Sequence, residues 1–458
     1  MMFSAIGPMN HARRPVIAVI CAGFLLFATS TPIEAQQPWT QFRGPDGSGI
    51  SENAHVELQI DPIDGATWRT ETPGQGWSSP VTDGHVVWMT AARVTPATAE
   101  QKKRALADVQ LADMKDVAGS VELLAIALDA KTGNTLQVIE LGQIDEPKPI
   151  HPMNGYASPT PAIDGDRVVV HFGQYGTWCL DIHSGDILWQ RTFVVDDSVG
   201  PGSSPVIHRG NVILTCDGMD KQFVVAVSLK TGETIWKTDR PTIDASNEEY
   251  RKSYSTPLLI QVDGETQAVI PCAQWCVAYD PQTGKEIWRV EHGDGFSVTP
   301  MPSYAGGNLI FSTGFMQAEL IAVDPHGRGD ITGSHVTWRA SKGGSRMSSM
   351  VTDESRIYSV SDDGILTALR LSDGKSLYRK RLGGKYSASP LRVQDRIAIA
   401  NHDGEFTVFR AGDEFTELAT YEFDEQVMAS PCVIDDALLI RTASAVYRFE
   451  PSKKVASE

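Results

Sequence analysis

Short stretches in which apolar and polar residues alternate follow one another along most of the chain. Residues 168–171 and 397–400 are two examples. A period of two is typical of strands that bury one face in a sheet. Glycine and proline together make up 66 of the 458 residues, 40 plus 26, and these residues favour turns. The pattern therefore predicts an all-β chain of many short strands.

A dipeptide of Ser or Thr followed by Pro opens such stretches at intervals along the chain. An eighth unit, Ser349-Met350, has Met in place of Pro. We expect the dipeptide to open the innermost strand of a repeating sheet. The seven copies are Ser79-Pro80, Ser158-Pro159, Ser204-Pro205, Thr256-Pro257, Thr299-Pro300, Ser389-Pro390 and Ser430-Pro431.

A second signature follows each of the first, and its fullest copy runs from Ala278 through Asp280, Thr283 and Gly284 to Trp288. The Asp-x-x-Thr-Gly segment predicts a hairpin turn, because Gly accepts a positive φ and Asp or Thr bonds the local backbone. The aromatic residue begins the next strand and offers a large apolar face to the neighbouring sheet. The predicted docking residues are Trp68, Trp189, Trp236, Trp288, Trp338 and Tyr378.

Repeats of about 40–50 residues with four short strands each are typical of propeller blades. The strand around Trp68 has no preceding blade in the sequence, and the last unit lacks its fourth strand. Residues 66–72 can therefore complete the last blade and remove its open edge. This arrangement predicts an eight-bladed β-propeller over residues 66–450, or seven blades if the first unit folds otherwise.

The first unit holds an insertion at about residues 97–119. Thr98 and Gln101 resemble a capping box, and the residues that follow are rich in Ala, Leu, Lys, Gln and Asp. We expect a small helix that ends at Gly119, with a charged flexible loop as the alternative.

The first 35 residues have the pattern of a secretory signal peptide. Arg13 and Arg14 precede an apolar run from Val16 to Ala28, and small and polar residues lead to Ala35. The run is shorter than the roughly 20 residues that a spanning helix needs. Cys21 leaves a lipoprotein signal as an alternative. Residues 36–65 are then a lead-in segment, residues 451–458 a tail, and the protein is expected in the periplasm or outside the cell.

Charge and cysteine content restrict the possible partners. The net charge is −17, which does not suit nucleic acid, because that binding depends on Lys and Arg. Five cysteines follow Cys21. Cys272 and Cys276 have a spacing that permits a bridge across a hairpin, but buried free cysteines are the simpler expectation. The 11 histidines show no paired ligand spacing, so no metal site is predicted.

The recurring Ala-x-Asp-x-x-Thr-Gly-x-x-x-Trp pattern resembles the tryptophan-docking motif of quinoprotein-type (PQQ-like) propellers. That group includes the PQQ-dependent alcohol dehydrogenases and the BamB propellers of outer-membrane assembly. The lead-in, from Trp39 through Arg43 to Gly49, and Trp77-Ser-Ser-Pro80 are similar to PQQ-like repeat proteins of planctomycete-type bacteria. The resemblance implies the propeller fold, while the docking motif itself does not bind the cofactor.

The resemblance to the dehydrogenases implies features that can be sought in the chain. Those enzymes have a vicinal cysteine pair and hold Ca²⁺ through Glu, Asn and Asp, and this chain has no adjacent cysteines and no residues that match the Ca²⁺ ligands. PQQ has three carboxylates and needs an Arg or Lys cluster, whereas Arg43 and Arg346 stand apart in the sequence. We therefore expect no cofactor, and PQQ with Ca²⁺ only if the protein is a dehydrogenase.

The residues just before each Ser/Thr-Pro unit offer a candidate binding surface. They should lie around the mouth of the central channel, where an aromatic ring suits a peptide strand, a sugar or a flat ligand. The alternative is that they pack between the blades. The leading hypothesis is a non-catalytic protein-binding or scaffold module of the cell envelope, and a quinoprotein dehydrogenase or a carbohydrate-binding propeller are alternatives. The candidate residues are Trp77, Tyr156, Tyr254, Phe296, Arg346 and Tyr386.

Overall fold

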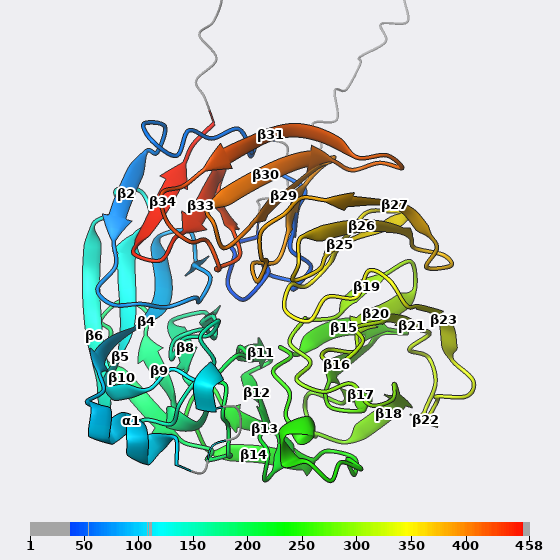
Figure 1. Cartoon of the computed structure of the whole chain (residues 1–458), viewed down its shortest axis with the longest axis horizontal. Coiled ribbons are helices and arrows are strands. Elements are labelled where there is room, and N and C mark those ends of the chain that lie inside the picture. The colour runs from blue at the N-terminus through cyan, green and yellow to red at the C-terminus, as the bar shows by residue number, and fades with distance from the viewer. Residues whose placement is uncertain (1–36, 54, 108, 110–111, 452–458) are drawn as a thin grey trace, which may run out of the picture. The chain divides into compact units, whose positions relative to one another are not determined.

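Eight antiparallel sheets follow one another around a centre in the computed structural model (Figure 1). The structure describes residues 37–53, 55–107, 109 and 112–451. The predicted signal peptide, and all but the first residue of the predicted tail, lie outside these residues. The prediction of an eight-bladed propeller with four-stranded blades is confirmed.

The first four blades hold β3 to β18, numbered outward from the centre within each blade. Blade one contains β3 (Val81–Thr82), β4 (Val86–Pro96), β5 (Ala118–Asp129) and β6 (Thr135–Asp145). Blade two contains β7 (Ala162–Asp164), β8 (Arg167–His171), β9 (Thr177–Asp181) and β10 (Ile187–Arg191). Blade three contains β11 (Val206–His208), β12 (Asn211–Asp217), β13 (Gln222–Ser228) and β14 (Thr234–Asp239). Blade four contains β15 (Leu258–Val262), β16 (Glu265–Pro271), β17 (Trp275–Tyr279) and β18 (Glu286–Glu291).

The remaining blades repeat this order. Blade five contains β19 (Ser303–Ala305), β20 (Asn308–Ser312), β21 (Leu320–Val323) and β23 (Val336–Ala340). Blade six contains β24 (Val351–Thr352), β25 (Arg356–Val360), β26 (Ile365–Arg370) and β27 (Ser376–Arg381). Blade seven contains β28 (Leu391–Val393), β29 (Arg396–Ala400), β30 (Glu405–Arg410) and β31 (Thr416–Glu422). Blade eight contains β32 (Cys432–Ile434), β33 (Ala437–Arg441), β34 (Ala445–Phe449) and β2 (Trp68–Glu71).

The last blade joins the two ends of the propeller. Strand β2 pairs antiparallel with β34, with Trp68 opposite Arg448 and Glu71 opposite Ala445. The predicted closure by an N-terminal strand is confirmed. It gives blade eight its fourth, outermost strand.

Hydroxyl groups link the innermost strands of neighbouring blades into a ring. The amide of one residue donates to the side-chain hydroxyl of its counterpart in the next blade, at 2.9–3.1 Å, in seven of the eight joints. At the remaining joint Met301 occupies the acceptor position and has no hydroxyl to offer. The members of the ring, in chain order, are Ser79, Thr160, Ser204, Thr256, Met301, Ser349, Ser389 and Ser430.

The ring corrects two units of the repeat. The sequence pattern assigns Ser158-Pro159 and Thr299-Pro300 to these positions, but the ring residues are Thr160 and Met301, two residues further along. Both segments contain a second X-Pro pair, and the strands β7 and β19 begin only after it. Two adjacent X-Pro pairs made the register ambiguous in the sequence.

A tryptophan on each of several outer strands packs against a glycine of the following blade. The indole N–H of Trp236 donates to the carbonyl of Pro281 at 3.2 Å, and a Cβ on Gly284 would lie 2.4 Å from the indole ring. The same pair of contacts links Trp68 to Ala130 and Gly133. Trp189 contacts Leu229 and Gly232, and Trp338 contacts Leu371 and Gly374 in the same way.

Two predicted docking residues use different contacts. The indole of Trp288 donates to Gln267 at 2.7 Å, and Gln267 donates to the carbonyl of Pro325 in blade five at 3.3 Å. The insertion that follows Pro325 places β22 (Gly329–Asp330) parallel to β18, as a fifth strand of blade four. Tyr378 packs against Phe415 of blade seven, with ring centroids 6.2 Å apart.

The segment before the propeller runs inside the ring of innermost strands, where Figure 1 shows it in dark blue. The amides of Thr82 and Ile163 donate to the carbonyls of Trp39 and Thr40, at 2.9 and 2.8 Å. The buried Arg43 donates to the carbonyls of Met350 and Pro390.

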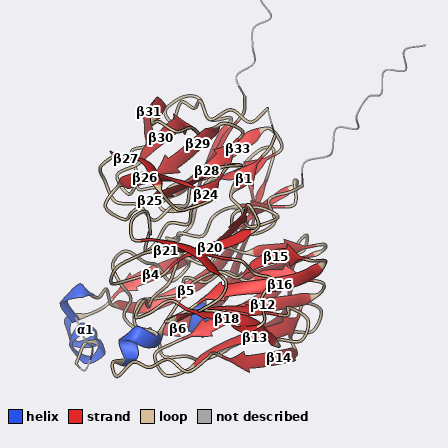
Figure 2. Cartoon of the chain, turned by 90° about the vertical axis from the view of Figure 1, so that its right-hand side faces the viewer, coloured by secondary structure: helices blue, strands red, loops and turns tan. Residues whose placement is uncertain are grey.

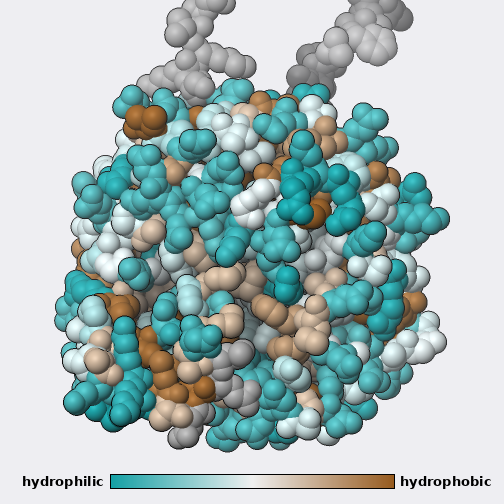
Figure 3. Space-filling model, viewed as in Figure 1, coloured by the Kyte–Doolittle hydropathy of each residue, from teal (hydrophilic) through white to brown (hydrophobic). Residues whose placement is uncertain are grey.

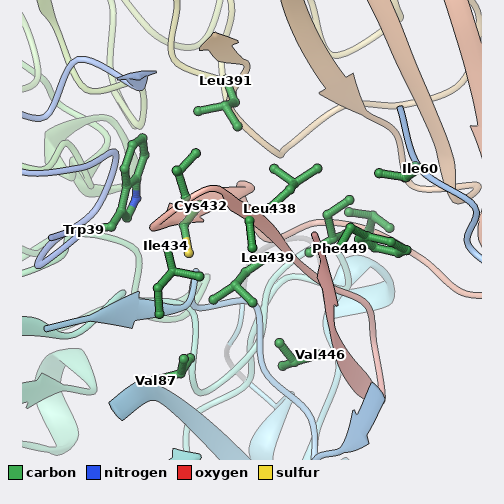
Figure 4. Packing of buried hydrophobic residues seen from close by; sticks show 14 of the residues in the cluster. Trp39, Ile60, Val87, Leu391, Cys432, Ile434, Leu438, Leu439, Val446 and Phe449 are labelled. Atoms are coloured by element: carbon green, nitrogen blue, oxygen red, sulfur yellow. The ribbon is translucent and has the colours of Figure 1, made fainter. Parts of the chain in front are cut away.

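Strand β1 (Ile50–Ser51) then pairs parallel with β28, and Trp39 packs beside Cys432 and Ile434 (Figure 4). The lead-in segment therefore contacts blades one, two, six, seven and eight from inside the ring.

The insertion in blade one begins as predicted. Helix α1 (Ala99–Ala105) has the expected capping box between Thr98 and Gln101, and it lies at the end of blade one (Figure 2). The helix is shorter than predicted, since it ends at Ala105. Gly119, the predicted helix end, lies within β5. Short 3-10 turns occur at Ala112–Met114, Gly173–Tyr175 and Glu248–Arg251.

Replacing Gly284 by Ala should lower the stability of the protein strongly. Gly284 has a φ of +71°, and the added Cβ would clash with the buried Trp236. Gly264→Ala is the matched control, because its φ is +82° but nothing lies within 4 Å of the added Cβ. We expect about 1–2 kcal/mol of destabilisation for Gly264→Ala and more than about 3 kcal/mol for Gly284→Ala in urea unfolding. Equal losses would show that the docking contact is unimportant.

The corrected register of the hydroxyl ring can be tested with Thr160→Val. This change keeps the side-chain shape but leaves the buried amide of Ser79 without its acceptor. We expect a loss of about 1–2 kcal/mol in the free energy of unfolding. Thr299→Val should cost less than half as much, because that half-buried hydroxyl donates only to Ser297 of its own loop, at 3.2 Å. A larger loss for Thr299→Val would contradict the register.

Candidate functional site

Two sets of loops share one end of the propeller. The first set leads into the innermost strands, and the second joins the second and third strands of each blade. Because neighbouring strands of a blade are antiparallel, both sets lie at the same end. We call this end the mouth face. Figure 3 shows it, with apolar and weakly polar residues around its middle and hydrophilic residues around its rim.

The six candidate residues do not form one open ring on the mouth face. Tyr156 and Tyr386 are buried, and each belongs to a hydrophobic cluster between blades. The hydroxyl of Tyr156 donates to the carbonyl of Lys148 at 3.0 Å. Trp77 is half-buried and covers Gly155, whose added Cβ would lie 3.2 Å from the indole ring. Tyr156 and Tyr386 therefore pack between the blades, which was the alternative to a binding surface.

Phe296 and Arg346 meet around a third residue, Phe315, which belongs to the loop between β20 and β21. The rings of Phe296 and Phe315 are 6.2 Å apart, and their backbones form an antiparallel bridge. The guanidinium of Arg346 lies 5.3 Å from the centroid of Phe315. The ring of Tyr250 lies 4.4 Å from that of Phe296, tilted by 33°, and Met316 beside Phe315 is 71% exposed. We call these five residues the mouth patch.

A carboxylate beneath the patch fixes its arginine. The Nε atom of Arg346 donates to Asp362 at 2.7 Å, and the backbone amides of Arg346 and Met347 donate to the same carboxylate at 3.3 and 3.1 Å. Burial raises the pKa of Asp362, although Arg346 opposes the shift. The sequence pattern Asp362-Asp363-Gly364 predicts a simple turn, whereas Asp362 also holds the loop that enters its blade.

A polar cluster lies beneath the insertion of blade one. Lys115 and the buried Lys252 both donate to Ser198, the former to its carbonyl at 2.6 Å and the latter to its hydroxyl at 3.0 Å. Glu249 accepts from Lys252 and, at 2.9 Å, from the hydroxyl of Ser198. Burial and the neighbouring Lys252 lower the pKa of Lys115. The cluster joins the insertion to the loops that enter blades three and four.

Tyr254 extends this cluster. Its hydroxyl donates to the buried Asp197 at 2.7 Å, so it is directed at a carboxylate of the protein. Burial raises the pKa of Asp197, and burial together with Asp197 raises the pKa of Tyr254 well above its ordinary value. Both groups therefore serve to hold the loops that enter blades three and four.

The groups on the mouth face offer few free ligands or bases. Among the residues that the structure describes, no group of three or more His, Cys, Asp or Glu side chains could hold a metal ion. His171 and His292 are buried, and burial lowers the pKa of each to about 4. The five cysteines after Cys21 are buried free thiols, and no helix of the described chain is long and apolar enough to cross a membrane.

The fit to PQQ and Ca²⁺ can be judged from these groups. The cations of the mouth patch and of the polar cluster are already engaged, Arg346 by Asp362 and Lys252 by Glu249. Arg441 lies under the mouth face without a carboxylate partner, but it is 1% exposed and donates to the carbonyl and hydroxyl of Ser78. Arg346, Lys252 and Arg441 are therefore not available to pair with the three carboxylates of PQQ.

A groove with a volume of about 630 Å³ lies at the other end of the propeller. Turns of blades three to five form it, and its lining includes Arg209, Glu265, Lys285 and Arg328. Arg328 pairs with Glu265 at 2.8 Å. The mixed charges give this groove no clear preference for a ligand.

The fold and the recurring docking contacts define a PQQ-like β-propeller. A family model described as outer membrane protein assembly factor BamB matches residues 64–258 and 273–414. The chain belongs to this family.

Solved structures of two kinds have the same fold. BamB from Moraxella catarrhalis has a TM-score of 0.52 at 14% identity, covering 84% of this chain and 99% of its own. Quinohemoprotein alcohol dehydrogenase from Comamonas testosteroni has a TM-score of 0.57 at 12% identity, covering 92% of this chain and 81% of its own.

A curated sequence gives a partial match. Methanol dehydrogenase [cytochrome c] subunit 1 of Methylobacterium organophilum is 26% identical over 149 residues, which are 30% of this chain and 24% of that protein. The chain thus spans about a quarter of this relative.

Sequence reasoning did not identify three residues of the mouth patch, Tyr250, Phe315 and Met316. They lie in loops that carry no repeat signature, and only the ring of blades brings them beside Phe296. A positive φ of 79° at Met316 exposes this apolar side chain, and nothing in the local sequence signals it.

Acidification should destabilise the protein through its two buried histidines. Between pH 6.5 and 4, His171 and His292 take up protons in the unfolded chain but remain neutral in the folded one. Their contribution is therefore complete above pH 6.5, and the free energy of unfolding falls by about 3 kcal/mol per histidine as the pH drops to 4. Urea unfolding at several pH values measures the slope.

The matching variants are His171→Gln and His292→Gln, which should flatten this slope whatever their effect at neutral pH. His183→Gln, at an exposed turn, should leave the slope unchanged. If the free energy of unfolding still falls with pH in a variant that carries both His171→Gln and His292→Gln, other groups cause the acid sensitivity.

Proposed function

We propose that the protein is an exported, non-catalytic protein-binding module of the cell envelope, which binds its partner at the mouth patch. The observation that carries the proposal is the patch itself, in which three aromatic rings, a methionine and an arginine form one surface. Aromatic, Met and Arg side chains are enriched at protein interfaces. Loops on a closed scaffold present such a surface without the need for catalytic groups.

The rigidity of the patch supports this role. Phe296 and Phe315 are joined by a backbone bridge, and Asp362 orients Arg346. A partner that binds here would order few additional side chains, which limits the entropic cost of association. The family description, outer membrane protein assembly factor, and the signal-like N-terminal sequence favour a place in the envelope.

A quinoprotein dehydrogenase is the second candidate, favoured by the partial similarity to methanol dehydrogenase subunit 1. The engaged state of Arg346 and Lys252 argues against it, because PQQ needs cations that are free to pair with its carboxylates.

Site-specific photocrosslinking in living cells tests the binding role. A photoreactive residue at Met316 should yield a discrete crosslinked product. The matched control is Tyr304 of β19, which is 37% exposed and lies near the turn to β20 at the other end of the propeller, and it should yield none. Phe315→Ala combined with Arg346→Gln should reduce crosslinking from Met316 by about tenfold or more. Equal products from both positions would contradict binding at the patch.

Calorimetric titration with PQQ, with and without Ca²⁺, separates the two candidates. We expect no binding at about 100 μM, which corresponds to a free energy weaker than about −5.5 kcal/mol. Tight binding that depends on Ca²⁺ would overturn the scaffold role and support the dehydrogenase.

A further inference from the structure

The outermost strand of blade six differs in charge from those of the other blades. Strand β27 carries Arg379, Lys380 and Arg381 and no carboxylate. The other seven outermost strands, β2, β6, β10, β14, β18, β23 and β31, have net charges between −2 and +1. The chain as a whole has a net charge of −17, so β27 is a local exception.

These cations have no carboxylate partner among the described residues. All three residues are exposed, and within the described part of the chain none of them takes part in an ion pair. Lys380 lies 5.3 Å from the ring centroid of Phe415 in blade seven. Since side chains alternate along a strand, Arg379 and Arg381 share the other side of β27. The nearest carboxylate in the sequence, Asp373, is occupied by Arg370 and Lys375.

The strand also has a free edge. Strand β27 pairs with β26 on one side, and no described strand pairs with the other. Its outer row of N–H and C=O groups can therefore accept a further strand.

Blade four shows what such an edge accepts in this molecule. Its outermost strand β18 carries β22 as a fifth strand, with Trp288 opposite Gly329 and Arg289 opposite Asp330. Arg289 and Asp330 approach to 4.0 Å, so an arginine on the edge is matched by a carboxylate on the added strand.

Position 379 of blade six corresponds to position 289 of blade four. Trp288 lies opposite Ala278 on its neighbouring strand, and Tyr378 lies opposite Ala368 in the same way. Arg379 therefore has the place of Arg289, but no added strand provides its carboxylate. The inner edge of blade seven gives a second example, because β1 pairs with β28 and Glu52 contacts Arg392 at 2.6 Å.

We infer that β27 is a docking edge for an extended acidic peptide segment of a partner protein. The segment adds to blade six as a fifth strand, parallel to β27 as β22 is to β18. Carboxylates at alternate positions of the segment face Arg379 and Arg381, and backbone hydrogen bonds hold the strand. The row of cations repels the same edge of a second copy of this chain, which favours a different, acidic partner. This edge is separate from the mouth patch and does not depend on its function.

A fluorescent peptide in which Glu alternates with Thr provides the probe, and fluorescence anisotropy measures its binding to the full mature chain. We expect binding that weakens with added salt, because exposed charges contribute. Arg379→Gln combined with Arg381→Gln should weaken it about tenfold. Arg370→Gln is the matched control, since Arg370 is a cation of the same blade that already pairs with Asp373, and it should have little effect. Near-UV circular dichroism checks that each variant is folded.

Two further peptides separate strand addition from simple charge attraction. The same peptide N-methylated at every second residue cannot donate hydrogen bonds along one edge, and the isomer methylated at the intervening residues cannot donate along the other. One of the two isomers should bind about tenfold more weakly than the other. A peptide with Lys in place of Glu should not bind. Equal binding of both isomers, or of wild type and the double variant, would overturn the inference.

Two other occupants are tested in parallel. The first is an anionic lipid surface, tested with vesicles of phosphatidylglycerol and phosphatidylcholine in equal parts. If anionic lipid is the true ligand, vesicles bind through Arg379 and Arg381 and the peptide does not. Analytical ultracentrifugation would reveal a second copy instead, as self-association that the double variant abolishes. Either result overturns the assignment to an acidic peptide.

Discussion

The contact between neighbouring blades is the constraint on which the rest of the structure depends. A single four-stranded sheet of this length cannot bury its faces alone, so each blade needs both neighbours. Two kinds of contact between neighbouring blades repeat around the ring. Near the centre, the amide of one innermost strand donates to the hydroxyl of the next. Toward the outside, an indole covers a glycine that must lack a side chain. Closure by β2 makes the circle complete and leaves no blade with an uncovered face.

The exceptions to these joints are as informative as the joints. Where blade five replaces the glycine turn by an insertion, Gln267 bridges Trp288 to Pro325, and the insertion itself adds β22 to the outside of blade four. Where Met301 removes a hydroxyl, its side chain packs against Gly47 of the lead-in segment instead. The molecule thus tolerates local loss of a repeated contact when another segment fills the space. Added strands are one way in which it does so.

Rigid joints explain why function is expected at the loops and edges. The mouth patch gathers residues from loops around blades four to six, and their positions depend on the ring rather than on any one blade. The polar cluster of Lys115, Ser198 and Lys252 similarly fixes the insertion over neighbouring loops. A scaffold of this kind presents a preformed surface, which suits partner binding. Its buried ionisable groups pair with other groups of the protein and stabilise the fold.

The repeat signatures by themselves predicted the propeller and its closure, because each signature is a local rule, and they favoured the eight blades that the structure has over seven. A glycine turn needs a positive φ, and the apolar alternation fixes which side of a strand is buried. The sequence pattern wrongly placed Ser158 in the hydroxyl ring, since both Ser158 and Thr160 precede proline and only the partner amide of Ser79 distinguishes them. It also left open the path of residues 38–51, the burial of Tyr156 and Tyr386, and the meeting of Tyr250, Phe315 and Arg346. These features depend on contacts between residues far apart in the chain, and such contacts are set only when the ring of blades has closed.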